Sequence, residues 1–252
     1  MQDIFVSDIG KGFPLVLVHG FLGSSEMWTP QIDYFKKEFR VISPDLPGFG
    51  RSNSLQSCSS IECMAAVIIK YLKKKNIDKF HLVGHSMGGM IVQEIVRTEG
   101  VRVSKLICYG TGPRGSMPGR FETLDQSRER LKKTGLNITV KRIAKTWFVN
   151  SEKAKYYNLC LDSGNSASLK AADKALLAMK NWNGEKFLKE IVSQTLIVWG
   201  DQDKAYNFNQ VETLNDNIPN SNLKIIKGCS HNVHLEKTDE FNTIVSEFLK
   251  KN

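Results

Sequence analysis

The sequence of 252 residues lacks any long apolar segment. No run of about 18 apolar residues occurs, which excludes a conventional membrane-spanning helix. The first residues also lack the basic region and the apolar stretch of a secretory signal peptide. Internal repeats and low-complexity tracts are absent, which argues against a repeat architecture. We therefore expect a cytoplasmic globular protein that does not act at a membrane.

Cysteine is scarce, and its spacing is not that of a disulfide framework. The chain has five cysteines, an odd number, and no C-x-x-C pair. This pattern predicts free thiols in a reducing compartment, which agrees with a cytoplasmic location. The five are Cys58, Cys63, Cys108, Cys160 and Cys229.

Features of nucleic-acid-binding proteins are also absent. Lysine and arginine number 35 against 26 aspartates and glutamates, a net charge of +9. Arginine-rich blocks, interleaved basic and aromatic residues and zinc-finger spacings do not occur, so we expect no nucleic-acid partner. Lysines such as those at 73–75 are typical of a solvated helix end. The positive charge is compatible with an anionic substrate.

Short, continuously apolar runs alternate with amphipathic stretches along most of the chain. Continuous apolarity is typical of strands that are covered on both faces, and strand–helix alternation predicts a parallel sheet. We expect an α/β fold with a mostly parallel, doubly wound sheet. The expected strands lie near 14–18, 39–43, 80–83, 105–109, 195–199 and 223–226, and the expected helices near 60–75, 87–98 and 238–250.

The alternation stops after a turn-rich stretch that begins near residue 110. The residues that follow, up to about 184, predict helices near 121–134, 137–149, 151–160 and 166–181, with no strand-like run. We therefore expect an α/β core formed by residues 1–112 and 185–252, with an inserted helical cap at 113–184.

Residues 84–88 read G-H-S-M-G and lie between an expected strand and an expected helix. In that context G-x-S-x-G predicts a nucleophile elbow, a tight turn that presents the serine above the sheet edge. Ser86 is the candidate nucleophile. The N–H groups that begin the following helix are suited to stabilise an anion there.

A serine nucleophile needs a base that takes its proton and an acid that orients this base. After a serine in a G-x-S-x-G elbow, the acid comes first in the chain and the histidine base comes second. Asp203, in the loop after the expected strand at 195–199, is the preferred acid, with Asp201 as the alternative. His231 lies beyond the last expected strand and is the preferred base. His234 is the alternative and is expected to pack at the start of the last helix. A zinc site on the two histidines is not favoured, because no suitable third ligand lies nearby.

Backbone N–H groups are expected to form the oxyanion hole. One belongs to Met87, after the nucleophile, and the other to Phe21, in the loop after the first strand. Within the expected cap, Arg114 and Arg120 are candidates to bind a substrate carboxylate. Apolar candidates for the lining of the pocket are Phe121, Trp147, Phe148 and Trp182, although packing of the cap on the core is the favoured explanation for each.

Together these motifs resemble the α/β-hydrolase superfamily across almost the whole chain. The segment 19–21 (H-G-F) resembles its oxyanion loop, 45–52 (D-L-P-G-F-G-R-S) its D-x-P-G-x-G-x-S turn, and 84–88 its elbow. Gly200 with Asp203 resembles the acid loop, and 231–236 the histidine region. The chain is similar to small bacterial enzymes with a helical cap, which include 3-oxoadipate enol-lactonases, carboxylesterases, C–C hydrolases of meta-cleavage products and cofactor-free haloperoxidases.

The resemblance implies a serine hydrolase that cleaves a small carboxylic ester or lactone through an acyl-enzyme, without a metal or cofactor. Serine rather than aspartate at position 86 argues against the chemistry of epoxide hydrolases and haloalkane dehalogenases. Three alternatives remain for this fold. The first is C–C hydrolysis of a meta-cleavage-type diketone, and the second is a ligand-sensing protein on the hydrolase fold. The third is a non-hydrolytic use of the same residues, as in cofactor-free oxygenases.

Overall fold

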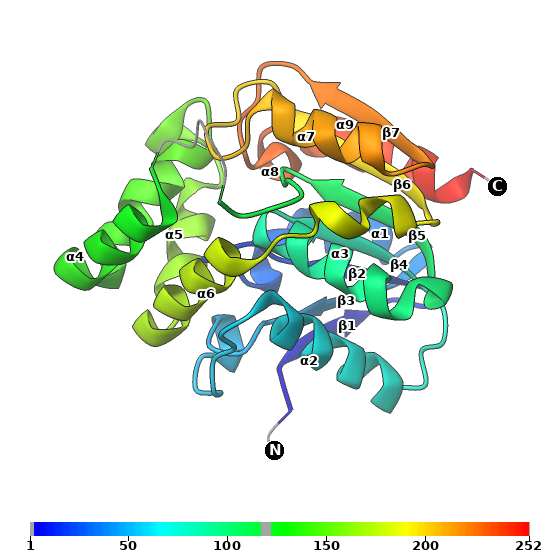
Figure 1. Ribbon diagram of the computed structural model, residues 1–252, viewed down its shortest axis with the longest axis horizontal. Coiled ribbons are helices and arrows are strands. Elements are labelled where there is room, and N and C mark those ends of the chain that lie inside the picture. Colours follow the sequence, from blue (N-terminus) through cyan, green and yellow to red (C-terminus); the bar gives the residue numbers. More distant parts are fainter. Residues whose placement is uncertain (1–2, 117–121, 252) are drawn as a thin grey trace.

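The computed structural model describes residues 3–116 and 122–251 and contains a seven-stranded sheet flanked by helices (Figure 1). The strand order is β1-β3-β2-β4-β5-β6-β7. All neighbouring strands are parallel except β1, which pairs with β3 in antiparallel fashion. The expected α/β fold with a mostly parallel sheet is confirmed. The strands are β1 (Val6–Ile9), β2 (Phe13–Val18), β3 (Phe39–Pro44), β4 (Phe80–His85), β5 (Val103–Tyr109), β6 (Gln194–Gly200) and β7 (Ser221–Ile226).

Six of these strands coincide with the predicted apolar runs, and β1 was not predicted. Strand β1 is a four-residue edge strand that is half-buried at Val6 and exposed at Ile9. It therefore lacks the continuous apolarity that marks the central strands. Its position follows from the antiparallel pairing of Val6 with Pro44, a contact between distant parts of the sequence.

Helices cover both faces of the sheet because alternate residues of each central strand point to opposite sides. In β2, Val16 and Val18 pack into a core with α2 and α3, whereas Leu15 and Leu17 pack into a second core with α1 and α9. The helices are α1 (Thr29–Phe35), α2 (Ile61–Lys74), α3 (Met87–Glu99), α4 (Leu124–Ala144), α5 (Tyr157–Asn165), α6 (Leu169–Asn181), α7 (Phe208–Asn217), α8 (Val233–Glu236) and α9 (Thr238–Lys250).

Residues 113–184, between β5 and β6, are called here the helical segment. Its helices α4, α5 and α6 lie together beside one end of the sheet, at the left of Figure 1. Helix α4 has two arms that meet at Gly135, where φ is 78° and ψ is 174°. The prediction of two helices at 121–134 and 137–149 agrees with these arms, although the second one ends at Ala144. Both α5 and α6 pack against α4.

Two of the five cysteines form a disulfide, so the prediction of five free thiols is wrong. Cys58 and Cys63 are joined across the turn before α2, with their Cα atoms 5.6 Å apart. Ser60 begins the helix here by accepting a hydrogen bond from the N–H of Cys63. This local fold brings the two thiols together, which a five-residue separation alone does not indicate. The free thiols of Cys108, Cys160 and Cys229 are buried.

We find no helix with both the length and the apolarity to cross a membrane in the ranges 3–116 and 122–251.

Candidate active site

Ser86 occupies the tight turn between β4 and α3. Its φ of 56° and ψ of −118° lie in a region that non-glycine residues rarely adopt, and such strain is common at functional sites. Hydrogen bonds hold this backbone in place. The Ser86 N–H donates to the carbonyl of Tyr109 over 2.9 Å, and the Thr111 hydroxyl donates to the Ser86 carbonyl over 2.8 Å.

The glycines around Ser86 are required by close backbone approach. A Cβ at Gly84 would lie 2.3 Å from the carbonyl oxygen of Gly88, and one at Gly88 would lie 2.2 Å from the carbonyl oxygen of Val18. Both distances are too short for any side chain. A Cβ at Gly20 would lie 2.9 Å from the Cβ of Ser86. The loop after β2 therefore passes directly beside the serine.

His231 and Asp203 are brought together from loops 28 positions apart in the sequence. Nδ1 of His231 lies 2.8 Å from Oδ2 of Asp203, and both side chains are buried. The other carboxylate oxygen, Oδ1, accepts hydrogen bonds from the N–H groups of Ala205 (2.7 Å) and Tyr206 (3.2 Å). Because an ionised carboxylate can only accept, Nδ1 of His231 is the donor in this contact.

The alternative acid and base have other partners. Asp201 is exposed, and its Oδ1 accepts a hydrogen bond from the N–H of Gly228 over 2.8 Å, so it caps a turn. His234 is fully buried, and its Nδ1 lies 3.0 Å from the Tyr109 hydroxyl. Burial lowers the pKa of His234 to about 3, with a further contribution from nearby His231. His234 is therefore neutral at physiological pH.

Ser86 and His231 line one cavity beneath the helical segment. Its volume is only about 20 Å³, which is room for about one water molecule. Most of its wall is apolar. Because the volume is so small, a substrate of several carbon atoms requires the side chains above Ser86 to move. The remaining lining residues are Phe21, Ser127, Ile143, Trp147, Leu176, Met179 and Ala205.

Two backbone N–H groups, those of Phe21 and Met87, are the predicted donors of the oxyanion hole. Phe21 lies in the loop after β2, and Met87 is the first residue of α3. Neither of these amides donates a hydrogen bond to a residue within 3–116 or 122–251. Met87 is at a helix N-terminus, where the free N–H groups favour a negative charge.

His19 fixes the loop that contains Phe21. Its Nε2 accepts a hydrogen bond from the N–H of Leu46 over 3.0 Å, so the proton resides on Nδ1, which donates to the carbonyl of Gly20 over 2.8 Å. Burial lowers the pKa of His19, which favours this neutral form. The sequence suggested a structural role for His19, in the segment that resembles the oxyanion loop, without naming its partners. The structure shows that it ties the loop after β2 to the D-x-P-G turn.

The loop that contains His231 is tied to the helical segment by Glu236. The Oε2 atom accepts a hydrogen bond from the N–H of Ser230 over 2.6 Å, and Oε1 accepts one from the N–H of Val149 over 2.7 Å. Burial raises the pKa of Glu236. The position of His231 is therefore coupled to that of the helical segment.

The predicted substrate-binding residues lie in different places. Trp147 lines the cavity, with its ring 6.5 Å from that of His231. Arg114 is exposed, pairs with Glu185 at 3.5 Å and does not line the cavity. Arg120, like Phe121, lies outside the described residues.

Two other aromatic candidates pack away from the cavity. Phe148 is 1% exposed within the larger core, and Trp182 donates from Nε1 to Glu94 over 3.3 Å. Sequence reasoning missed Ser127, Ile143, Leu176, Met179 and Ala205 of the wall. The three-residue spacing of Leu176 and Met179 places them on one helix face, but it does not indicate what that face covers.

The described residues were also compared with the side-chain groupings that hold metal ions. Within 3–116 and 122–251, no cluster of three or more histidine, cysteine, aspartate or glutamate side chains is arranged to hold one.

Comparison with known proteins identifies the family of this chain. The family model of the alpha/beta hydrolase fold matches residues 14–238. The chain is 29% identical to a pimeloyl-[acyl-carrier protein] methyl ester esterase of Legionella pneumophila (strain Corby), over 99% of this chain and 100% of that one. It is 30% identical to a 2-hydroxy-6-oxononadienedioate/2-hydroxy-6-oxononatrienedioate hydrolase of Burkholderia vietnamiensis, over 98% and 91%.

The solved structures show the same fold. An enol-lactonase from Burkholderia xenovorans superposes with a TM-score of 0.91 at 19% identity, covering 98% of this chain and 96% of the other. The matched family model spans most of the chain, including the elbow and both loops that meet at His231. The chain therefore belongs to the alpha/beta hydrolase family and is a hydrolase.

Proposed function

We propose that this hydrolase cleaves a small carboxylic ester or lactone through a serine nucleophile. The observation that carries the proposal is the 2.8 Å contact between Nδ1 of His231 and Oδ2 of Asp203 at the cavity that contains Ser86. This pairing gives the histidine the tautomer that a general base requires.

The reaction proceeds by acyl transfer to water. Nε2 of His231 takes the proton of Ser86, whose oxygen attacks the carbonyl carbon of the substrate. The Asp203 carboxylate stabilises the imidazolium that forms. The N–H groups of Phe21 and Met87 stabilise the oxyanion, at about 3 kcal/mol for each donor. The leaving alkoxide takes the proton from His231, and water then repeats the sequence to release the acid.

The helical segment sets the substrate range in this proposal. Ile143, Leu176 and Met179 present only apolar atoms to the cavity, and Trp147 covers the side near His231. Such a wall favours an uncharged acyl chain next to the scissile bond. The relative from Legionella pneumophila is a methyl ester esterase, which supports an ester with a small alcohol. The location of Arg114 gives no support to a carboxylate clamp at that residue.

A C–C hydrolase is the second candidate, favoured by the 30% identity to the relative from Burkholderia vietnamiensis. The same serine and histidine would then act on a vinylogous diketone, with His231 as the proton shuttle. A ligand-sensing protein is a third candidate, which would retain its ligand without turnover.

The test is hydrolysis of p-nitrophenyl acetate, a longer p-nitrophenyl ester and several lactones by the wild type and by Ser86→Ala. Ser246→Ala, which removes a buried hydroxyl from α9, is the matched control. We expect Ser86→Ala to lose activity and Ser246→Ala to keep it. Turnover of a dienoate ring-fission product without ester hydrolysis would establish the C–C hydrolase instead, and no turnover with tight ligand retention would favour the sensor.

A further inference from the structure

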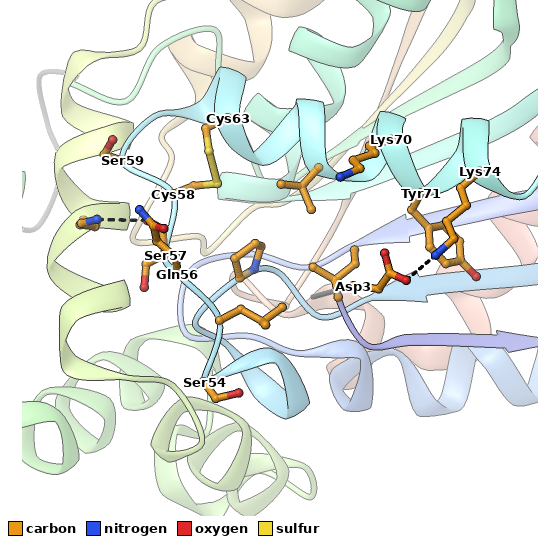
Figure 2. A pocket seen from close by; sticks show the side chains of 15 residues that line it. Asp3, Ser54, Gln56, Ser57, Cys58, Ser59, Cys63, Lys70, Tyr71 and Lys74 are labelled. Atoms are coloured by element: carbon orange, nitrogen blue, oxygen red, sulfur yellow. Dashed lines mark hydrogen bonds and ion pairs between the residues drawn. A yellow bond between two sulfur atoms is a disulfide. The ribbon is translucent and has the colours of Figure 1, made fainter. Parts of the chain in front are cut away.

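A second cavity lies away from Ser86, between α2 and the loop that precedes it. Its volume is about 530 Å³, within the range of about 300–1,000 Å³ that is typical of small-ligand sites. Figure 2 shows Lys70, Tyr71 and Lys74 of α2 together with residues 54–59 of the loop around this cavity. It is far larger than the space of about 20 Å³ above Ser86.

The two cavities are separate because α6 lies between them. Lys174 lines the second cavity, whereas Leu176 and Met179 line the one above Ser86. At 3.6 residues per turn, Lys174 is about 160° from Leu176 and about 140° from Met179 around the helix. The opposite faces of one helix therefore border two different sites.

The charge at the second cavity is positive. Lys74 pairs with Asp3 at 2.5 Å. Within residues 3–116 and 122–251, neither Lys70 nor Lys174 forms an ion pair, although Asp3 lies near enough to Lys70 to interact with its charge. Lys174 donates to the carbonyl of Ser57, over 3.1 Å. The four charged side chains of the lining thus give a net charge of +2, from three lysines and one aspartate.

The rest of the lining combines polar side chains of the loop with an apolar part, and a disulfide holds it in place. Half-buried Ile4, Leu55 and Val67, with buried Pro47, offer a surface for a hydrocarbon body. The disulfide between residues 58 and 63 closes one wall and ties the loop to the start of α2 (Figure 2). A wall fixed before binding reduces the entropy lost when a ligand binds.

We propose that this cavity binds an amphipathic monocarboxylate, a medium-chain carboxylic acid, with its carboxylate at Lys70 and its chain against Ile4, Leu55 and Val67. A charge-assisted hydrogen bond anchors the head, and burial of the chain supplies the remaining affinity. The site does not depend on the reaction at Ser86. If the proposed hydrolysis of esters is correct, the released acid belongs to the same chemical class as this ligand.

The test is a titration of the full-length protein with octanoate, followed by NMR of labelled isoleucine, leucine and valine methyl groups. The methyls of Ile4, Leu55 and Val67 report on the second cavity, and those of Ile143 and Leu176 report on the cavity above Ser86. We expect saturable shifts at the first three. Octanol, with the same chain and no charge, should bind about ten-fold more weakly because it lacks the charged anchor, a difference of about 1.4 kcal/mol.

Two lysine variants identify the anchor. Lys70→Met should weaken octanoate binding by about ten-fold. Lys73→Met makes the same change three residues further along α2. Lys73 pairs with Glu99 and does not line the cavity, so this variant should keep an affinity close to that of the wild type. Because both lysines are exposed, neither change is expected to prevent folding.

Four results would overturn the proposal. They are the absence of saturable shifts at Ile4, Leu55 and Val67, shifts confined to Ile143 and Leu176, equal affinity for octanol and octanoate, and equal loss in the two lysine variants. None of these readouts requires turnover, so failure of this site and failure of the proposed hydrolysis are distinguished by separate measurements.

Discussion

His234 makes the stability of the protein sensitive to acid. It is fully buried, with its ring 4.7 Å from that of Trp28 and 6.1 Å from that of Phe241. Its pKa of about 3 in the folded protein lies below the ordinary value of 6.5. Below pH 6.5 the unfolded chain therefore takes up a proton that the folded protein does not. Stability contributed by this residue is complete above that pH and is lost as the pH falls toward 3.

The size of this effect follows from the difference in proton binding. Each pH unit below 6.5 removes about 1.4 kcal/mol, so acidification from about pH 7.5 to about pH 4.5 costs about 3 kcal/mol through His234 alone. His234→Phe keeps an aromatic ring at this position and removes the titrating group. The free energy of unfolding of the variant should therefore fall by about 3 kcal/mol less than that of the wild type over the same pH range.

Urea unfolding followed by tryptophan fluorescence at several pH values measures this difference. The comparison uses the slope of stability against pH, so a variant that is less stable throughout remains informative. Phe241→Leu is the matched control, because it disturbs the same cluster and retains His234. Its slope should equal that of the wild type. Equal slopes for His234→Phe and the wild type would refute the reasoning.

Three further predictions concern the site at Ser86. Asp203→Asn should lower kcat by at least about 10³-fold, because His231 loses the carboxylate that fixes its tautomer. Asp201→Asn should keep a kcat close to that of the wild type in the same ester assay, and equal losses in the two variants would contradict the proposal of Asp203 as the acid. Gly20→Ala should lower kcat by about 10²–10³-fold with an unchanged circular dichroism spectrum, because the new Cβ displaces the loop beside the serine, and full activity would count against an oxyanion role for this loop. Met179→Ala should lower the free energy of unfolding, measured in urea, by about 2–5 kcal/mol. Because Met179 lines the cavity, the same change should raise kcat/KM for long acyl esters relative to short ones, and an unchanged ratio would show that this side chain does not limit chain length.

Features that depend on neighbours along the chain follow from local sequence patterns. The pattern at 84–88 predicted a strand, a tight turn and a helix because only glycine fits where the backbone of Gly84 and Gly88 comes within contact distance of other backbone atoms. Apolar runs likewise identified six strands, of which β2 to β6 are largely buried, whereas β7 at the other edge is mostly exposed or half-buried. The exposed edge strand β1 has no such pattern, since its place depends on pairing with β3.

Features that depend on contacts between distant residues were decided by the tertiary structure. Asp201 and Asp203 are chemically identical candidates two positions apart, and only the path of the loops brings Asp203 to His231. The disulfide between residues 58 and 63 required the turn before α2, and the cavity walls required α4 and α6 to pack over the sheet. Sequence alone determined the order of the motifs and the position of the turn that presents Ser86, because both are encoded by local spacing. The partners and surroundings of the side chains depend on the folded path of the chain, so they were settled only in three dimensions.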